Sequence, residues 1–166
     1  MLGEPLAMQV PRVVGVRLEG RLQAGVTATD LALTVTQAMR RHGVIAKVVE
    51  FFGPGVDTLT LPERATLSNM TPEYGANMGF FPVDAETLAY LSLTGRPPAQ
   101  VALVEAYCKA QGLWRDTAQP PPDYAQVVEI DLAAIEPCMA GPGRPDARVP
   151  LAQVPRAFAS VVASSA

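Results

Sequence analysis

Hydrophobic and polar positions alternate in the stretch VVGVRLEG, residues 13–20, and this alternation predicts a β-strand. Apolar side chains then recur at helical spacing over residues 27–43. At the start of this segment Thr27 and Asp30 have the spacing of a capping box, and at its end Gly43 is a typical stop signal. The pattern therefore predicts an amphipathic helix directly after the first strand.

A mostly apolar, β-branched segment follows at residues 44–55 and closes on Gly-Pro-Gly, so we expect a second strand there. A strand, a helix and a strand in this order favour a parallel strand pair. Another helix is expected to begin at Pro62, because proline is well tolerated in a first turn. Pro72 should end or kink this helix near Thr71.

Two more helices are expected in succession. Asp84 is a typical N-cap for the first, which Gly95 terminates, and the second covers residues 97–112. A proline-rich connector at residues 117–126 then leads to an expected strand at residues 127–132. The remaining tail is dense in glycine and proline, and we expect at most a short helix near its end.

These elements predict an α/β domain with a mainly parallel sheet flanked by helices. The chain has 166 residues, within the roughly 100–200 residues of one ordinary domain. We assign the α/β domain to residues 1–118. Residues 119–166 are expected to form the connector, a strand and an extended C-terminal arm that packs on the same domain.

The composition narrows the classes of protein. Hydrophobic residues make up 49% and charged residues 17% of the chain, and the apolar runs are too short for a membrane span. Thirteen basic against sixteen acidic residues give a net charge of −3, which argues against a surface that follows a nucleic-acid backbone. The N-terminal residues lack the basic start of a signal peptide, so we expect a cytoplasmic protein.

Groups that bind metals or act as nucleophiles are few. The two cysteines, Cys108 and Cys138, have no second cysteine or histidine at metal-ligand spacing, so we expect no metal held by this chain alone. His42 is the single histidine, and we interpret it as a last-turn residue that complements a helix dipole. No complete set of nucleophile, base and orienting residue is present in the pattern.

Three polar residues attract attention before an apolar loop. Asn69, Glu73 and Asn77 are spaced by four and four, which on a continuous helix puts them on one face. Pro72 weakens this argument, because a kink there separates Asn69 from Glu73. A carboxylate beside Tyr74 and the apolar loop can have a raised pKa and act in proton transfer, or Glu73 can be an ordinary surface glutamate.

Three long blocks of the sequence, at residues 14–55, 64–96 and 127–151, closely resemble the aconitase family in its aconitase A and iron-regulatory-protein branch. The resemblance covers nearly the whole chain. It implies a three-layer aconitase-type domain that corresponds to the second α/β domain of a family chain several times longer.

The resemblance also implies an activity. The family enzymes interconvert citrate and isocitrate through cis-aconitate and use a four-iron four-sulfur cluster. Glu73, in the motif PEYG, matches the active-site glutamate that lies close to the substrate and the cluster-bound oxygen. Asn69, in the motif SNM, matches an asparagine packed beside the cluster. The resemblance therefore implies one wall of an iron-sulfur hydro-lyase site, inactive alone, with the tricarboxylate bound only in the complete enzyme.

The chain departs from the family in several places. The family's Asp-Ser-His segment, cluster cysteines, substrate-binding arginines and serine base fall outside the match. Cys108 and Cys138 do not match the cluster ligands, and Cys138 stands where a small residue such as serine is expected. Asn77 replaces a threonine or small residue, and Gly143 stands where lysine is common.

Two alternatives stay open from the sequence. The chain can be a stand-alone binding module that uses the apolar residues Met78, Phe80 and Phe81 to bind a protein partner, or binds RNA, against which the acidic balance argues. It can also be one subunit of a split enzyme, assembled with separately encoded aconitase domains. In the first hypothesis the partners are the remaining aconitase domains, in the same or a separate chain.

Overall fold

The computed structural model describes residues 3, 7, 9–118, 120–141, 143, 144 and 146–165. Most of the N-terminal residues that bear on the signal-peptide argument, and Gln119 at the expected start of the C-terminal segment, lie outside these described residues.

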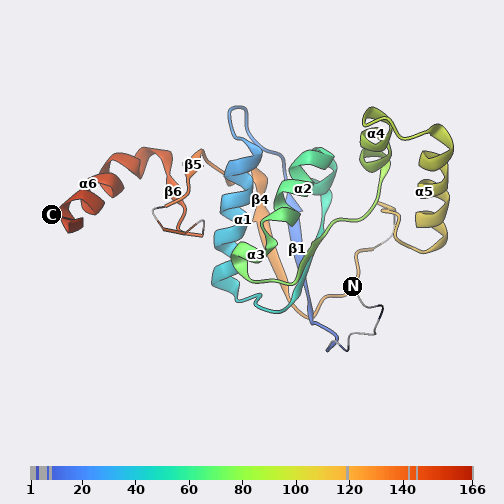
Figure 1. The fold of residues 1–166 in the computed structure, drawn as a ribbon, viewed down its shortest axis with the longest axis horizontal. Coiled ribbons are helices and arrows are strands. Elements are labelled where there is room, and N and C mark those ends of the chain that lie inside the picture. Colours follow the sequence, from blue (N-terminus) through green and yellow to red (C-terminus); the bar gives the residue numbers. More distant parts are fainter. Residues whose placement is uncertain are drawn as a thin grey trace.

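A four-stranded, fully parallel sheet forms the centre of the structure (Figure 1). Its strands are β1 (Val13–Glu19), β2 (Val48–Phe52), β3 (Met78–Phe80) and β4 (Val127–Asp131), in the spatial order β3-β2-β1-β4. The parallel pair that the sequence predicted is β1 with β2, joined through a helix. The expected α/β class, with a mainly parallel sheet flanked by helices, is confirmed.

The first predicted helix is α1, Ala28–His42. The backbone N–H of Asp30 donates to the Thr27 hydroxyl oxygen, and the Asp30 carboxylate accepts from the Thr27 backbone N–H at 2.7 Å, so the capping box is confirmed. Gly43 ends the helix in the left-handed conformation with φ 80°, which glycine adopts without steric cost.

The second strand is shorter than the sequence predicted. We expected residues 44–55, but β2 covers Val48–Phe52 only. The backbone N–H of Lys47 donates to the Val44 carbonyl, which makes a turn before the strand. After the strand a short 3₁₀ helix, η1, covers Pro54–Thr58. Val44 is nevertheless fully buried, so its apolar character reflects burial in the core, and burial does not require a strand.

Two short helices replace the next predicted helix. The first, α2, covers Leu61–Asn69, and the second, α3, covers Thr71–Tyr74. Met70 lies between them with ψ 9°, away from the helical value, and Pro72 occupies the first turn of α3. The predicted break near Thr71 is therefore confirmed.

The next two predicted helices are α4 (Ala85–Leu93) and α5 (Pro98–Ala110). They pack against each other, and in the view of Figure 1 they lie at the right, at a distance from α1. Asp84 accepts a hydrogen bond from the backbone N–H of Thr87 and so caps α4 as predicted. The predicted strand after the connector is β4.

The C-terminal segment contains more structure than the sequence predicted. A short antiparallel ribbon joins β5 (Cys138–Met139) to β6 (Val149–Pro150). A 12-residue helix, α6 (Val154–Ser165), follows and contacts β6, and it lies beyond the ribbon from the sheet in Figure 1. The tail thus forms a ribbon and a helix of three turns, where we expected at most a short helix.

The core lies between one face of the sheet and helices α1, α2 and α3. It includes the following buried side chains: Val14, Val16, Leu18, Leu31, Val35, Met39, Val49, Phe51, Leu67 and Tyr74. The opposite face of β1 carries Gly15 and the exposed Arg17. Tyr124 of the connector packs there, because a Cβ added to Gly15 would lie 2.5 Å from a Tyr124 ring carbon. None of the described helices is long and apolar enough to cross a membrane.

Candidate functional site

Asn69 and Glu73 lie on either side of a sharp bend in the chain. Asn69 is the last residue of α2, Glu73 lies within α3, and both side chains are exposed. Because Met70 interrupts the helix between them, they do not share one continuous helical face. Asn77 lies beyond the bend, and its side-chain amide donates to the Ala46 carbonyl at 3.3 Å. The structure therefore ties Asn77 to the turn before β2.

The inner side of the same bend is buried and polar. Thr71 is 3% exposed and Tyr74 is fully buried. The Thr71 hydroxyl lies 2.5 Å from the Ser68 carbonyl oxygen and 3.2 Å from the Tyr74 hydroxyl. Burial raises the pKa of Tyr74, the hydrogen bond with Thr71 partly offsets this, and the negative charge of Glu73 raises the pKa again. The bend thus has a fixed inner side and an outer side that presents a carboxylate and a carboxamide.

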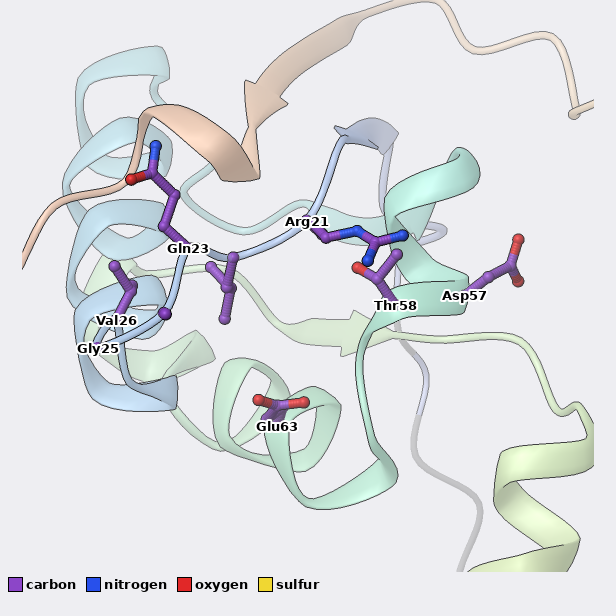
Figure 2. A pocket seen from close by; sticks show the side chains of 9 residues that line it. Arg21, Gln23, Gly25, Val26, Asp57, Thr58 and Glu63 are labelled. Carbon is purple, nitrogen blue, oxygen red and sulfur yellow. The ribbon is translucent and has the colours of Figure 1, made fainter.

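A shallow polar cavity of about 540 Å³ lies near the carboxyl end of β1 (Figure 2). Arg21, Asp57, Thr58 and Glu63 are among the residues that line it. The Glu63 carboxylate already accepts from the backbone N–H and the hydroxyl of Thr60, at 2.7 and 2.8 Å. Asn69 and Glu73 are not part of the lining, so this cavity is separate from the bend.

A larger cavity of about 680 Å³ lies between β1, β2 and the connector. Arg115 closes one side of it and donates to both carboxylate oxygens of Asp57, at 2.9 and 3.0 Å. Tyr124 forms another wall, and burial together with the Glu50 carboxylate raises its pKa. The sequence did not indicate this cavity, because its walls come from several separate segments between residues 17 and 124 and no local motif marks them.

The apolar segment after the bend, which we expected to be a loop, contains the strand β3 and is only partly exposed. Met78 is 49% exposed, but Phe80 and Phe81 are half-buried. Phe81 stacks on the core residue Phe51 with a centroid distance of 4.3 Å and nearly parallel rings. Of the three residues expected to form a partner-binding patch, Met78 is therefore well exposed, whereas most of the aromatic surface of Phe80 and Phe81 is covered.

The described residues do not provide a ligand set for an iron-sulfur cluster. Among them, no group of three or more histidine, cysteine, aspartate or glutamate side chains is placed to hold a metal ion. Cys108 is buried on α5, and Cys138 is half-buried on β5, where burial raises the pKa of its thiol. Cluster ligation by this segment thus has no support in its donor geometry.

Comparisons with known proteins agree on one family. The family model described as "Aconitase family (aconitate hydratase)" matches residues 1–166. The chain is 58% identical over 159 residues to aconitate hydratase A of Thermus thermophilus, with 95% of this chain and 18% of that protein covered. It is 54% identical over 160 residues to aconitate hydratase A of Escherichia coli, with 96% and 18% covered. The chain therefore spans about 18% of the length of these curated relatives.

Proposed function

Because the chain belongs to the aconitase family, we propose that it forms one wall of an aconitate hydratase active site and supplies Glu73 and Asn69 to it. The observation that carries this proposal is the arrangement at the bend between α2 and α3. Both side chains are exposed there, while the residues beneath them are buried. An exposed carboxylate and carboxamide on a rigid support suit a site that a second domain completes.

The chemistry of dehydration explains why such groups are useful. Loss of water from a hydroxy-tricarboxylate requires removal of a proton bound to carbon and departure of the hydroxyl group. A carboxylate can accept a hydrogen bond from that hydroxyl or exchange a proton with it. A carboxamide can both donate and accept, so it can orient a polar neighbour. In this proposal Glu73 acts at the substrate hydroxyl, and Asn69 orients the group beside it.

The remaining parts of the site must come from other segments. The family implies a four-iron four-sulfur cluster in the complete enzyme, and the described residues do not fit its ligation. We therefore assign the cluster ligands, the base and the binding groups for the tricarboxylate to the other aconitase domains, in the same chain or in a separately encoded one. On this assignment the segment alone has no hydratase activity.

The test is a chimera. The matching segment of the Thermus thermophilus protein is replaced by this chain, and formation of cis-aconitate from citrate is followed by its ultraviolet absorbance after anaerobic reconstitution. We expect the chimera to be active and this chain alone to be inactive. Glu73→Gln should lower kcat of the chimera by about 100-fold or more, the usual scale of a lost acid-base group.

Glu86→Gln is the matched control, because Glu86 is an exposed glutamate in the first turn of another short helix, α4. It should leave kcat unchanged. Turnover in the Glu73→Gln chimera equal to that of the parent chimera would remove Glu73 from the proposed site. An inactive parent chimera that folds and contains its cluster would contradict the proposal for the segment as a whole.

A further inference from the structure

The two buried hydroxyls under the bend form a directed hydrogen-bond chain. The Ser68 carbonyl oxygen can only accept, so the Thr71 hydroxyl donates its single proton to it at 2.5 Å. The Thr71 oxygen is then left as an acceptor for the Tyr74 hydroxyl at 3.2 Å. The chain therefore runs from Tyr74 through Thr71 to the backbone of α2.

The neighbouring strand leaves no room for this chain to shift. A Cβ added to Gly79 of β3 would lie 2.7 Å from the Thr71 hydroxyl oxygen and 3.3 Å from the Tyr74 hydroxyl. The missing side chain thus lets β3 pack directly on the pair. At the other end of α3 the Gly75 carbonyl accepts from the Ala46 backbone N–H at 2.9 Å. The bend is held by the sheet on one side and by the turn before β2 on the other.

The hydrogen-bond chain spans the point where the site residues sit. Asn69 follows Ser68, the acceptor end, and Glu73 precedes Tyr74, the donor end. The hydrogen bonds that connect Tyr74, Thr71 and Ser68 therefore bridge the short stretch of chain that contains Asn69 and Glu73. The Thr71–Ser68 hydrogen bond joins α3 to α2, so it bears on how the two helices are inclined to each other. The Tyr74–Thr71 contact lies within α3 and can act on that link only by holding the Thr71 hydroxyl.

We propose that Thr71 and Tyr74 are positioning residues, which hold the bend so that Glu73 and Asn69 face the substrate in the orientation that the reaction needs. This inference rests on the proposed function, because it concerns the same site. Neither hydroxyl touches the reacting atoms, since both are buried on the inner side of the bend. Their effect is transmitted through the backbone of α2 and α3.

The test uses Tyr74→Phe in the chimera, which removes the hydroxyl and keeps the ring that fills the core. We expect kcat to fall by about tenfold, less than the roughly 100-fold that a misplacement of about 1 Å can cost. KM should change by less than about twofold, because no contact with the substrate is lost. In the Glu73→Gln chimera the same substitution should have no further effect on kcat, because the group that it positions is already gone.

A second pair of variants covers the case in which Tyr74→Phe does not fold. Thr71→Val removes the hydroxyl that links Tyr74 to Ser68, with little change of shape, and should lower kcat by a similar factor. Thr71→Ser keeps a hydroxyl at this position and should have a kcat close to that of the parent chimera. Thermal unfolding of each variant reports whether the fold is retained. A purely structural role would lower the melting temperature and leave kcat of the folded fraction unchanged.

The outcomes separate this inference from the proposal on which it rests. An inactive parent chimera that folds and contains its cluster, or an active one in which Glu73→Gln has no effect, overturns the proposed function and this inference with it. An active parent that Glu73→Gln impairs, combined with an unchanged kcat in Tyr74→Phe and Thr71→Val, overturns the inference alone. So does an equal fall in kcat for Tyr74→Phe with and without Glu73.

Discussion

Arg64 and Asp84 form an ion pair with 2.7 Å between the guanidinium Nη1 and the carboxylate Oδ2. The Arg64 side chain is 1% exposed, and that of Asp84 is 13% exposed. Arg64 also donates to the carbonyls of Leu59 and Val56 at 3.1 and 3.0 Å. Asp84 in turn caps α4. One buried side chain therefore joins the start of α2, the 3₁₀ helix η1 and the start of α4.

Arg64→Met should destabilise the fold strongly, because it leaves the carboxylate of Asp84 and two carbonyls without their donor. We expect the free energy of unfolding to fall by about 3 kcal/mol, the lower end of the cost of removing one partner from a buried pair. Urea unfolding followed by circular dichroism measures it. Glu105→Gln, in an exposed pair with Lys109 on α5, is the control and should change stability by less than about 1 kcal/mol. Equal small effects would contradict the structural role of Arg64.

Asp30 should make stability depend on pH in the acid range. Burial opposes ionisation of this carboxyl, but hydrogen bonds from Thr27 and from the Cys138 backbone N–H outweigh burial and hold its pKa below the ordinary value of 3.8. A lowered folded pKa means that the stabilisation is complete above 3.8 and is lost as the pH falls below that value.

Asp30→Asn is expected to cost about 1–2 kcal/mol near neutral pH, because it replaces a charged cap and acceptor by a neutral one. The difference between the parent and the variant should shrink as the pH is lowered through the acid range. Urea unfolding of both proteins between about pH 7 and about pH 3 tests this. A difference that stays constant over that range would show that Asp30 acts without its charge.

Gly15→Ala should loosen the connector from the sheet. The added methyl would lie 2.5 Å from a ring carbon of Tyr124 and 2.9 Å from a ring carbon of Phe52, so one of the rings must move. Overpacking of this kind costs about 1–3 kcal/mol. We expect faster proteolytic cleavage within residues 117–126, measured by mass spectrometry of timed digests. Val13→Ala, at a partly exposed position of the same strand, is the control and should leave the cleavage rate unchanged.

Cys138 should react slowly with alkylating agents. Burial raises the pKa of its thiol, and the thiolate is the reactive form, so less of it is present at a given pH. We expect a rate with iodoacetamide at about pH 8 at least about fivefold below that of a free thiol in urea-unfolded protein. Cys108→Ser leaves Cys138 as the single thiol and makes the measurement unambiguous. Equal rates in the folded and unfolded protein would contradict the burial of Cys138.

Local signals in the sequence predicted the ends of the elements well. The capping box of Thr27 and Asp30 and the break before Pro72 are made within one or two helical turns, so neighbouring residues suffice to specify them. The limits of the second strand were wrong, because Val44 is apolar for burial in the core and its backbone lies in a turn. Spacing and local chemistry first drew attention to Glu73 and Asn69 but left Glu73 open as a surface residue, and the family motif then gave both a role in a site.

By itself the sequence determined the order of most elements from β1 to β4, several of their caps and the family motif, since each is encoded over a few adjacent positions. It missed β3, the ribbon of β5 and β6 and the length of α6. Only the tertiary structure decided that β4 pairs with β1, over a hundred residues earlier, and that Gly79 lies against Thr71 and Tyr74. It also decided which side of the bend is buried and which side presents Glu73. Strand pairing and burial depend on segments far apart in the chain, and no local pattern specifies which of them will meet.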